Sequence, residues 1–496
     1  MRITRHPILE FDRGRKILFY FNDKKVEGFE GESIASALHA SGVRVLSYSL
    51  RYHRPRGFFC GIGKCSSCFM TVDGVPNVRT CITPIRENMR VRRQDGGVGE
   101  LSDKRFAARK KMVVDDEIVV VGGGPAGMMA ALAAAKQGAS VTLIDENHRV
   151  GGQLIKQTHK FFGSLEEKAG KRGIEIAEEL MKQINSVPGI HLILSTTVVG
   201  CYNNNTEDGG DRYRLVAVRR FMDGDQLLDV FCKRIVFACG AMENMLAFPG
   251  NDLPGVYGAG GVQTLMNVYG VRPGDRVLMV GAGNVGLIVS YQLLQAGVEV
   301  DRVVEVLPRI TGYHVHAAKL RRCGVPIYTS HSIKEAYGSD RVEGAVVVEV
   351  DKNYAPVSGT EENVSCDTIC LAVGLTPSVR LLEQMGVKTE FIPEAGGYVA
   401  VHDQSMQTSL NGVYVAGDAS GIEEASTAMI EGQLAGVSAA ASLGYDRGAD
   451  ELISRCRNAL RIFRSGPFGE IPRRGKEKIA YLFDKMGKKI WGDSEL

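Results

Sequence analysis

The chain has 496 residues, which is too long for one ordinary hydrophobic core and predicts two to four domains. Hydrophobic residues make up 44% of it and charged residues 24%, as is typical of soluble globular proteins. A net charge of +3 gives no case for nucleic-acid binding, and no run of 18 apolar residues predicts a transmembrane segment. The N-terminal residues lack the apolar core of a signal peptide, so we expect a cytoplasmic protein.

The first 100 residues are predicted to form a small domain of their own. An apolar strand over residues 17–21, a turn at Asn22-Asp23 and a second strand over residues 26–29 precede a helix over residues 32–41. Residues 69–72 and 75–78 are predicted to form a hairpin around Asp73-Gly74. Residues 86–111, which are rich in basic side chains and contain Gly96-Gly97, are predicted to be a surface linker.

This domain contains four cysteines within 22 residues, Cys60, Cys65, Cys68 and Cys81. The first three have the spacing C-x4-C-x2-C of plant-type [2Fe–2S] proteins. One alternative is a zinc site, which usually takes two C-x2-C-like pairs where this segment has one. The other is four unrelated buried thiols. Because disulfides are rare in the cytoplasm, eleven cysteines argue for metal or redox use of some of them, and we predict a [2Fe–2S] cluster on these four.

Residues 118–146 predict a βαβ unit that binds a dinucleotide. An apolar strand leads into the spacing G-x-G-x-x-G, an Ala-rich helix follows, and a second strand ends at an acidic residue. The helix N-terminus offers free N–H groups to a pyrophosphate, and the acid stands where a ribose hydroxyl is bound. The candidate residues are Gly122, Gly124, Pro125, Ala126, Gly127, Asp145 and Glu146, joined by Gly152 and Gln153 of the next Gly-Gly segment.

A second unit of the same kind covers residues 276–305. Its candidate residues are Gly281, Gly283, Asn284, Val285 and Glu305. A carboxylate at the end of the second strand favours a free ribose 2′-hydroxyl, so we predict NAD rather than NADP. Arg309 nearby weakens this prediction, because an arginine can accommodate the 2′-phosphate of NADP. The alternative is a nucleotide-binding fold that has lost its ligand.

The last hundred residues contain a strand over 413–416 that ends at Gly417 and Asp418, a helix over 425–441, and two further helical segments around Gly466. The final segment places five apolar side chains on one face, Ile479, Leu482, Phe483, Met486 and Ile490. We expect this face to pack on the protein's own core or on a partner subunit; peripheral attachment to a membrane is the less favoured alternative.

The two glycine motifs, the strand ends FACGA and LAVGLTP, and the late VYVAGD together resemble the two-dinucleotide-binding-domain flavoproteins over about residues 115–445. The resemblance implies an α/β fold with two Rossmann-like domains, one inserted in the other, after a β-grasp ferredoxin-like domain. It implies a [2Fe–2S] domain at 1–100, an FAD domain at 113–251 and 356–445, a nucleotide domain at 252–355 and a helical tail at 446–496. Gly417 and Asp418 would then complete the FAD site that begins at Gly122. No C-x2-C or C-x4-C pair follows residue 115, which disfavours a disulfide reductase.

The segments SLRYHRPRGFFCGIGKCSSC and GVPNVRTC, placed ahead of such a flavoprotein, resemble alpha subunits of heteromeric sarcosine oxidases, dye-linked L-proline, hydroxyproline and opine dehydrogenases, and hydrogen cyanide synthase. The resemblance implies an electron-transfer subunit, whose FAD-containing beta partner oxidises an amine or amino acid. Electrons would pass between flavin and the [2Fe–2S] cluster toward a quinone or a ferredoxin. The implied cofactors are FAD, or ATP in its place, and the cluster, with NAD in the second site and FMN at a subunit interface as further options.

Two other functions stay open at this point. One is a self-contained NAD(P)H:acceptor flavin oxidoreductase, and the other is a scaffold subunit whose nucleotides only stabilise it. The sequence predicts no catalytic acid or base in this chain.

Overall fold

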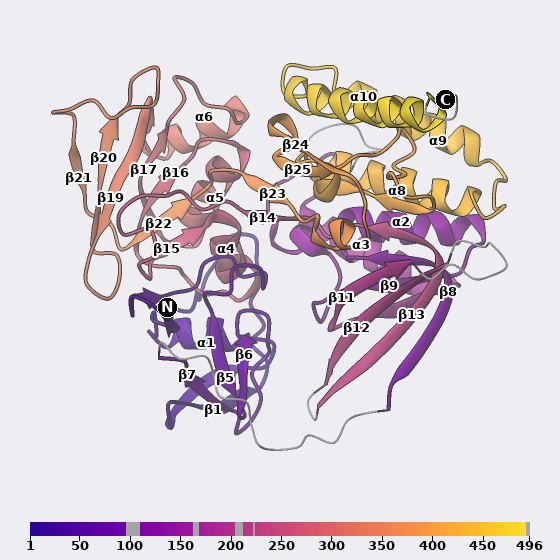
Figure 1. Ribbon diagram of the computed structural model, residues 1–496. Helices are drawn as coiled ribbons and strands as arrows, with labels where there is room; N and C mark the ends of the chain where they lie inside the picture. Colours follow the sequence, from indigo (N-terminus) through magenta and orange to yellow (C-terminus); the bar gives the residue numbers. More distant parts are fainter. Residues whose placement is uncertain (96–109, 162–167, 204–211, 222–223, 493–496) are drawn as a thin grey trace. The chain divides into compact units, whose positions relative to one another are not determined.

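The computed structural model describes residues 1–95, 110–161, 168–203, 212–221 and 224–492. The chain forms two compact units, and each combines two separate stretches (Figure 1). The first unit contains residues 1–105 and 243–374, and the second contains residues 106–242 and 375–496. Along the sequence, the chain forms part of the first unit and then part of the second, completes the first unit, and finally completes the second. This order is expected when one domain is inserted in another.

The N-terminal part of the first unit is a five-stranded sheet in the order β2-β1-β7-β5-β6. Strands β1 and β7 are parallel and the other neighbours are antiparallel. Its elements are β1 (Lys16–Phe21), β2 (Lys24–Phe29), α1 (Ile34–Ala40), β5 (Phe69–Val72), β6 (Val75–Arg79) and β7 (Arg90–Arg93). A separate hairpin consists of β3 (Ser47–Tyr48) and β4 (Pro55–Arg56). This is the β-grasp arrangement that the resemblance implies.

The predicted linker over residues 86–111 is wrong in its first part. Residues 90–93 form β7 in the middle of the sheet, with Val91 buried in the core. The guanidinium groups of Arg90 and Arg93 lie 5.3 and 5.4 Å from the ring centroids of Tyr20 and Phe21. A strand with three arginines among its four residues gives no apolar alternation to recognise in the sequence. The rest of that prediction, including Gly96-Gly97, largely falls outside the described residues.

The second part of the first unit is a parallel five-stranded sheet in the order β15-β22-β16-β17-β18. Its elements are β15 (Val256–Gly258), α4 (Ala259–Gln263), a π-helical turn η2 (Thr264–Val268), β16 (Arg276–Val280), α5 (Asn284–Gln295), β17 (Glu299–Glu305), α6 (His314–Arg322), β18 (Ile327–Thr329) and β22 (Thr368–Leu371). An antiparallel sheet of β19 (His331–Tyr337), β20 (Gly344–Glu349) and β21 (Glu362–Val364) adjoins it in sequence. The unit extends beyond the predicted range of 252–355, because β22 lies beside β16.

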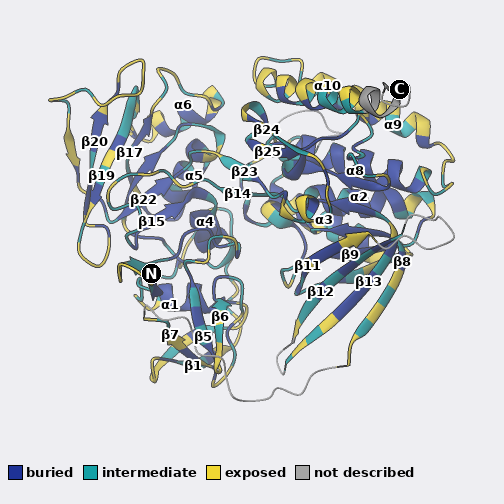
Figure 2. Cartoon of the chain, viewed as in Figure 1, coloured by how far each residue is buried: buried dark blue, intermediate teal, exposed yellow. Residues whose placement is uncertain are grey.

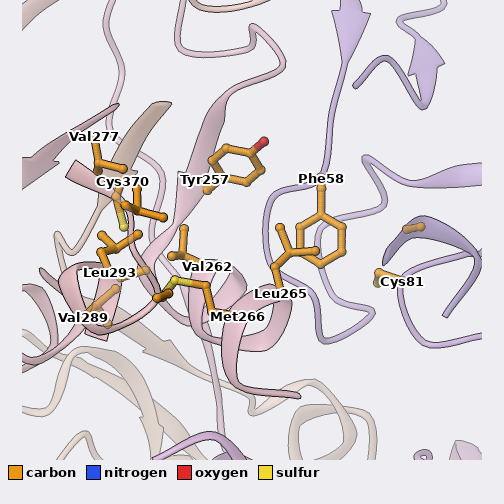
Figure 3. Packing of buried hydrophobic residues seen from close by; sticks show 14 of the residues in the cluster. Phe58, Cys81, Tyr257, Val262, Leu265, Met266, Val277, Val289, Leu293 and Cys370 are labelled. Carbon is orange, nitrogen blue, oxygen red and sulfur yellow. The ribbon is translucent and has the colours of Figure 1, made fainter. Parts of the chain in front are cut away.

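The two parts of the first unit share one hydrophobic core. Phe58 next to the cysteine loop, Cys81, Tyr257 and Leu265 belong to a single buried cluster with the strands and helices of the parallel sheet (Figure 3). The Tyr257 hydroxyl donates to the carbonyl of Pro273 at 3.3 Å. The N-terminal domain is therefore packed onto the inserted domain rather than tethered to it.

The second unit is built on a seven-stranded sheet. Strands β10, β9, β8 and β13 lie side by side and parallel, β26 pairs with the end of β13, and β12 and β11 extend the sheet antiparallel. These strands are β8 (Met112–Val121), β9 (Val141–Ile144), β10 (Ile190–Ile193), β11 (Thr196–Asn203), β12 (Tyr213–Phe221), β13 (Gly224–Phe237) and β26 (Val413–Val415). The short strands β14 (Ala241–Glu243) and β23 (Leu375–Pro377) pair, as do β24 (Thr389–Ile392) and β25 (Gly397–Ala400).

Helices α2 and α8 pack against each other beside this sheet and are buried, whereas α9 and α10 expose much of their surface (Figure 2). The helical elements are α2 (Pro125–Gln137), η1 (Gly152–Lys156), α3 (Gly173–Ser186), α7 (Arg380–Gln384), η3 (Pro393–Ala395), η4 (Gly417–Ser420), α8 (Ala425–Ala441), α9 (Ala449–Phe463) and α10 (Glu470–Gly492). Within the described part of the chain, no helix is both long and apolar enough to cross a membrane. The predicted fold class is confirmed.

Candidate functional site

The structure brings the four predicted cysteines together. The Cys60 thiol lies close enough to those of Cys65 and Cys81 to interact with both, and the Cys68 thiol interacts with that of Cys81. Three of the thiols are buried, and Cys65 keeps partial exposure. The interactions with Cys65 and Cys81, helped by the backbone N–H groups of Ile62 and Lys64, lower the pKa of Cys60. Such N–H donors stabilise a charged sulfur and tune an iron–sulfur centre.

Four thiols gathered in one place match the number of cysteines that hold a [2Fe–2S] cluster. Within the described ranges, no three His, Cys, Asp or Glu side chains are arranged to hold a single metal ion. The contacts between the thiols run from Cys65 to Cys60, from Cys60 to Cys81 and from Cys81 to Cys68, so the four side chains form one connected group.

The cysteine loop is held against the inserted domain by close backbone packing. Gly258 N–H donates to the carbonyl of Phe59 at 3.2 Å, and a Cβ on Gly261 would lie 1.9 Å from that carbonyl oxygen. On the other side of the loop, the carbonyl of Cys68 accepts the Thr80 hydroxyl at 2.6 Å. The loop therefore has little freedom to change shape.

The first glycine motif sits where β8 turns into α2. Gly122 has φ +107°, and a Cβ there would lie 2.3 Å from the carbonyl oxygen of Ala238. A Cβ on Gly127 would lie 1.7 Å from the carbonyl oxygen of Gly122, so the helix packs directly on the turn. At Gly124 the nearest atom is the Gly152 Cα at 3.9 Å, so the protein itself does not fill the space in front of this residue. That is the position at which a pyrophosphate approaches the backbone.

The second glycine motif repeats this construction in the first unit. A Cβ on Gly281 would lie 2.3 Å from the carbonyl oxygen of Ala372, and one on Gly286 would lie 2.0 Å from that of Gly281. At Gly283 the nearest atom is Thr311 Oγ1 at 3.6 Å. Asn284 begins α5, and Val285 is exposed on its first turn. Both glycine loops therefore keep the shape that dinucleotide binding requires.

The two acids predicted to bind ribose, Asp145 and Glu305, lie at the ends of their strands, where each accepts hydrogen bonds from backbone N–H groups of the adjoining loops. Asp145 is buried and accepts the N–H groups of Gly123 at 2.6 Å and Asn147 at 2.7 Å. Glu305 is buried in the same way and accepts from Ala282 at 2.8 Å and Leu307 at 3.0 Å. These bonds shape the loops, and binding of a ribose by either acid stays a prediction. Glu146 is half-buried and Gln153 is exposed.

The late Gly-Asp pair lies against the first motif, as the resemblance implies. A Cβ on Gly417 would lie 2.8 Å from the Cβ of Ala126, on the first turn of α2. Gly417 N–H donates to Glu431 at 3.0 Å. Burial raises the pKa of Asp418 to about 7, and the nearby carboxylates Glu431 and Glu423 raise it further than Lys476 lowers it.

Sequence reasoning missed the cluster of buried ion pairs around Glu431, which adjoins Gly417 and Asp418. Glu431 accepts from Ser420 at 2.7 Å, from Lys476 at 2.8 Å and from Arg464 at 2.6 Å. Arg464 also holds Glu423 at 2.7 Å. Both cations come from the C-terminal tail, and Ile479 of α10 is buried in the same unit. The available signal was Glu431 itself, the one charged residue in the sequence of α8.

We expect Asp418→Asn to remove a pH dependence from the chain without bound nucleotide. A carboxyl group whose pKa is raised on folding contributes stability in full below its ordinary pKa of 3.8, and loses it as pH rises through about 7. The melting temperature of the unmodified chain should therefore fall over this range relative to the variant, which should be the more stable at pH 8. Equal pH slopes in thermal unfolding would contradict the buried position of this carboxyl.

Gly124→Ala is expected to weaken FAD binding by about tenfold or more while leaving the fold intact, because its methyl group enters space that the protein leaves free. Flavin titration and thermal unfolding measure the two effects. Gly466→Ala adds the same methyl group where no atom lies within 4 Å and should change neither. A lower melting temperature in Gly124→Ala without loss of affinity would contradict this placement.

Comparison with known proteins agrees with this architecture. The family model of the pyridine nucleotide-disulphide oxidoreductases matches residues 116–432, and that of a 2Fe-2S iron-sulfur cluster binding domain matches residues 14–96. The crystal structure of L-proline dehydrogenase from P. horikoshii superposes with a TM-score of 0.67 at 26% identity, covering 92% of this chain and 79% of that chain.

Two curated relatives come from Rhizobium meliloti (strain 1021). The sarcosine oxidase alpha protein is 24% identical over 462 residues, which cover 82% of this chain and 44% of that protein. The opine oxidase relative is 33% identical over 245 residues, which cover 45% and 51%. The chain spans about half the length of these relatives. It belongs to the pyridine nucleotide-disulphide oxidoreductase family, has an N-terminal segment that matches the 2Fe-2S domain, and is similar to the sarcosine oxidase alpha and opine oxidase relatives.

Proposed function

We propose that this chain is the electron-transfer subunit of a heteromeric flavin-dependent dehydrogenase that oxidises the C–N bond of an amine or amino acid such as sarcosine, L-proline or hydroxyproline. The observation that carries this proposal is the meeting of four cysteine thiols in one site, in a chain that also has a glycine loop with free space in front of Gly124. The names of the relatives support the substrate class and the membership of a larger complex.

The chain's own residues would bind and orient the redox groups. Bound FAD would supply the conversion between two-electron and one-electron transfer, and the cluster would carry single electrons. The N-terminal N–H groups of α2 would hold the FAD pyrophosphate in front of Gly124, with Asp418 beside it. Cys60, Cys65, Cys68 and Cys81 would hold the cluster in a loop whose shape the inserted domain restricts.

The proposal includes a partner that supplies the chemistry of substrate oxidation. This partner is an FAD-containing beta subunit, with FMN at the shared interface and a quinone or a ferredoxin as the electron acceptor. ATP in place of FAD is compatible with the same glycine loop, because the loop binds a pyrophosphate and not the flavin ring. The subunits and cofactors that co-purify from the native source identify these components directly.

A second candidate function is a self-contained NAD(P)H:acceptor oxidoreductase, which the intact loop at Gly281 and Gly283 favours. The two functions differ in one experiment. The flavin-loaded chain without a partner, mixed with NADH, should keep its flavin absorption under our proposal. Adding the partner and its amine substrate should then bleach the flavin. Bleaching by NADH at a catalytic rate would overturn the proposal in favour of the second candidate.

A further inference from the structure

The positive charge of this protein is concentrated in the domain that holds the cysteines. Residues 1–95 contain 17 Lys and Arg against 9 Asp and Glu, a net charge of +8, whereas the whole chain carries +3. The remaining residues therefore carry a net charge of −5. Charge of one sign on one face attracts oppositely charged partners and raises their rate of association.

A β-hairpin places part of this charge beside the cysteines. Strands β3 and β4 enclose residues 49–54, and the Ser47 hydroxyl at the base of the hairpin donates to the carbonyl of Ser67 at 3.0 Å. Ser67 lies between Cys65 and Cys68, and the strand β4 leads within four residues to Cys60. The hairpin is thus joined to the cysteine loop twice, through the Ser47–Ser67 hydrogen bond and through the chain that runs from β4 to Cys60.

The tip of this hairpin exposes two large apolar side chains among its cations. Tyr52 is 67% exposed and Leu50 is 58% exposed. The guanidinium groups of Arg51 and Arg54 lie 5.3 and 5.8 Å from the ring centroid of Tyr52. Arg54 also pairs with Asp252 at 3.4 Å, whereas Arg51 has no carboxylate partner among the residues that the structure describes. Tyr and Arg side chains arranged in this way are the residues that dominate binding energy at protein interfaces.

The cysteine site reaches the surface at Cys65, two residues from Ser67 at the base of the hairpin. Cys60, Cys68 and Cys81 are buried, but Cys65 is partly exposed between the exposed side chains of Lys64 and Ser66. A protein bound at this turn and at the hairpin tip would therefore lie against the one thiol of the four that reaches solvent.

We propose that the hairpin tip (residues 49–54) and the turn at residues 64–66 form the docking surface for an acidic protein that carries single electrons. This inference rests on the proposed function and names the chemistry of its acceptor. One electron leaves the reduced centre on the four cysteines and enters the docked protein, so the centre is oxidised, the carrier is reduced, and no bond forms or breaks. A neutral quinone would gain nothing from the basic surface.

The test uses the chain together with its co-purified subunits and an acidic plant-type [2Fe–2S] ferredoxin as the probe. We expect Arg51→Glu/Arg54→Glu to weaken ferredoxin binding at low salt, and to slow its reduction by the dithionite-reduced complex, by at least about tenfold. Salt should weaken binding to the unmodified complex in the same way. Lys24→Glu/Lys25→Glu is the matched control, because it makes the same charge change at exposed residues of the edge strand β2, and it should change both quantities less than about twofold.

Further measurements distinguish a loss of docking from a loss of the bound redox groups. Reduction of a small neutral dye should be equal in all three proteins, and reduction of a basic cytochrome c should be faster in Arg51→Glu/Arg54→Glu. Ferredoxin binding that is equal in this variant and its control, or that strengthens with salt, would overturn the docking proposal. A complex without iron that transfers no electron to any acceptor would overturn the proposed function, while the binding measurement would still decide the docking surface.

Discussion

Replacing Cys60 with alanine is expected to abolish the iron–sulfur centre and all transfer of single electrons from the chain. Cys60 interacts with two of the other three thiols and accepts from two backbone N–H groups, so its loss removes one of the four proposed ligands and its contacts with two others. Iron should fall from two atoms per chain to background after reconstitution, and the visible charge-transfer bands should disappear. Reduction of a one-electron acceptor should fall to background with them.

The matched control for this variant is Cys366→Ala. Cys366 is buried in the same unit, in a hydrophobic cluster where burial raises the pKa of its thiol to about 12. It is therefore an inert core thiol, and its removal should leave the iron content unchanged. Full iron and unchanged bands in Cys60→Ala would exclude this residue as a ligand.

Replacing Glu431 with alanine is expected to lower the free energy of unfolding by about 3–5 kcal/mol, because it leaves buried cations without their carboxylate. The side chains of Lys476 and Arg464 are 11% and 14% exposed, and each lies within 3 Å of a Glu431 oxygen. Denaturant unfolding measures the change. Glu477→Ala removes a surface pair with Arg473 on the same tail helix and should cost at most about 1 kcal/mol.

The same group predicts how stability depends on acid. Burial alone would raise the pKa of Glu431, but Lys476 and Arg464 outweigh it and lower the pKa to about 2. A carboxyl group with a lowered pKa contributes stability above its ordinary value of 4.5 and loses it as pH falls toward 2. This part of the acid sensitivity should be missing from Glu431→Ala, and an unchanged acid unfolding profile would contradict the ion pairs.

Local patterns in the sequence predicted the parts of the structure that local geometry determines. The spacing of the cysteines predicted that all four would meet, since three of them lie in one loop and the hairpin β5–β6 returns the fourth. The glycine motifs predicted α2, which starts at Pro125 and is followed by Gly138 in a left-handed conformation at φ +110°. Both motifs are short stretches whose backbone shape is set mainly by the spacing of their own residues.

The interactions that sequence reasoning missed join residues far apart in the chain. Glu431 and Lys476 are 45 positions apart in different helices, and no periodicity relates them. From the sequence, the cluster domain and the inserted domain were predicted as two separate domains. The contact between Gly261 and Phe59 joins them, and no pattern of neighbouring residues indicates that contact. In β7, Arg90 and Arg92 are exposed, but the half-buried Arg93 takes the side of the strand that Val91 also occupies, so the sequence shows no apolar alternation.

Phe58 and Leu265 belong to one hydrophobic core, so the cluster domain is expected to unfold locally only together with the part of the inserted domain that shares this core (Figure 3). Amide hydrogens in a loop exchange with solvent when the smallest cooperative unit that contains the loop opens. Because the cysteine loop packs through Phe59 on Gly261, that unit includes the inserted domain. Amides of the loop and of α4 should then exchange at similar rates, and a chelator should extract iron no faster than this whole unit opens.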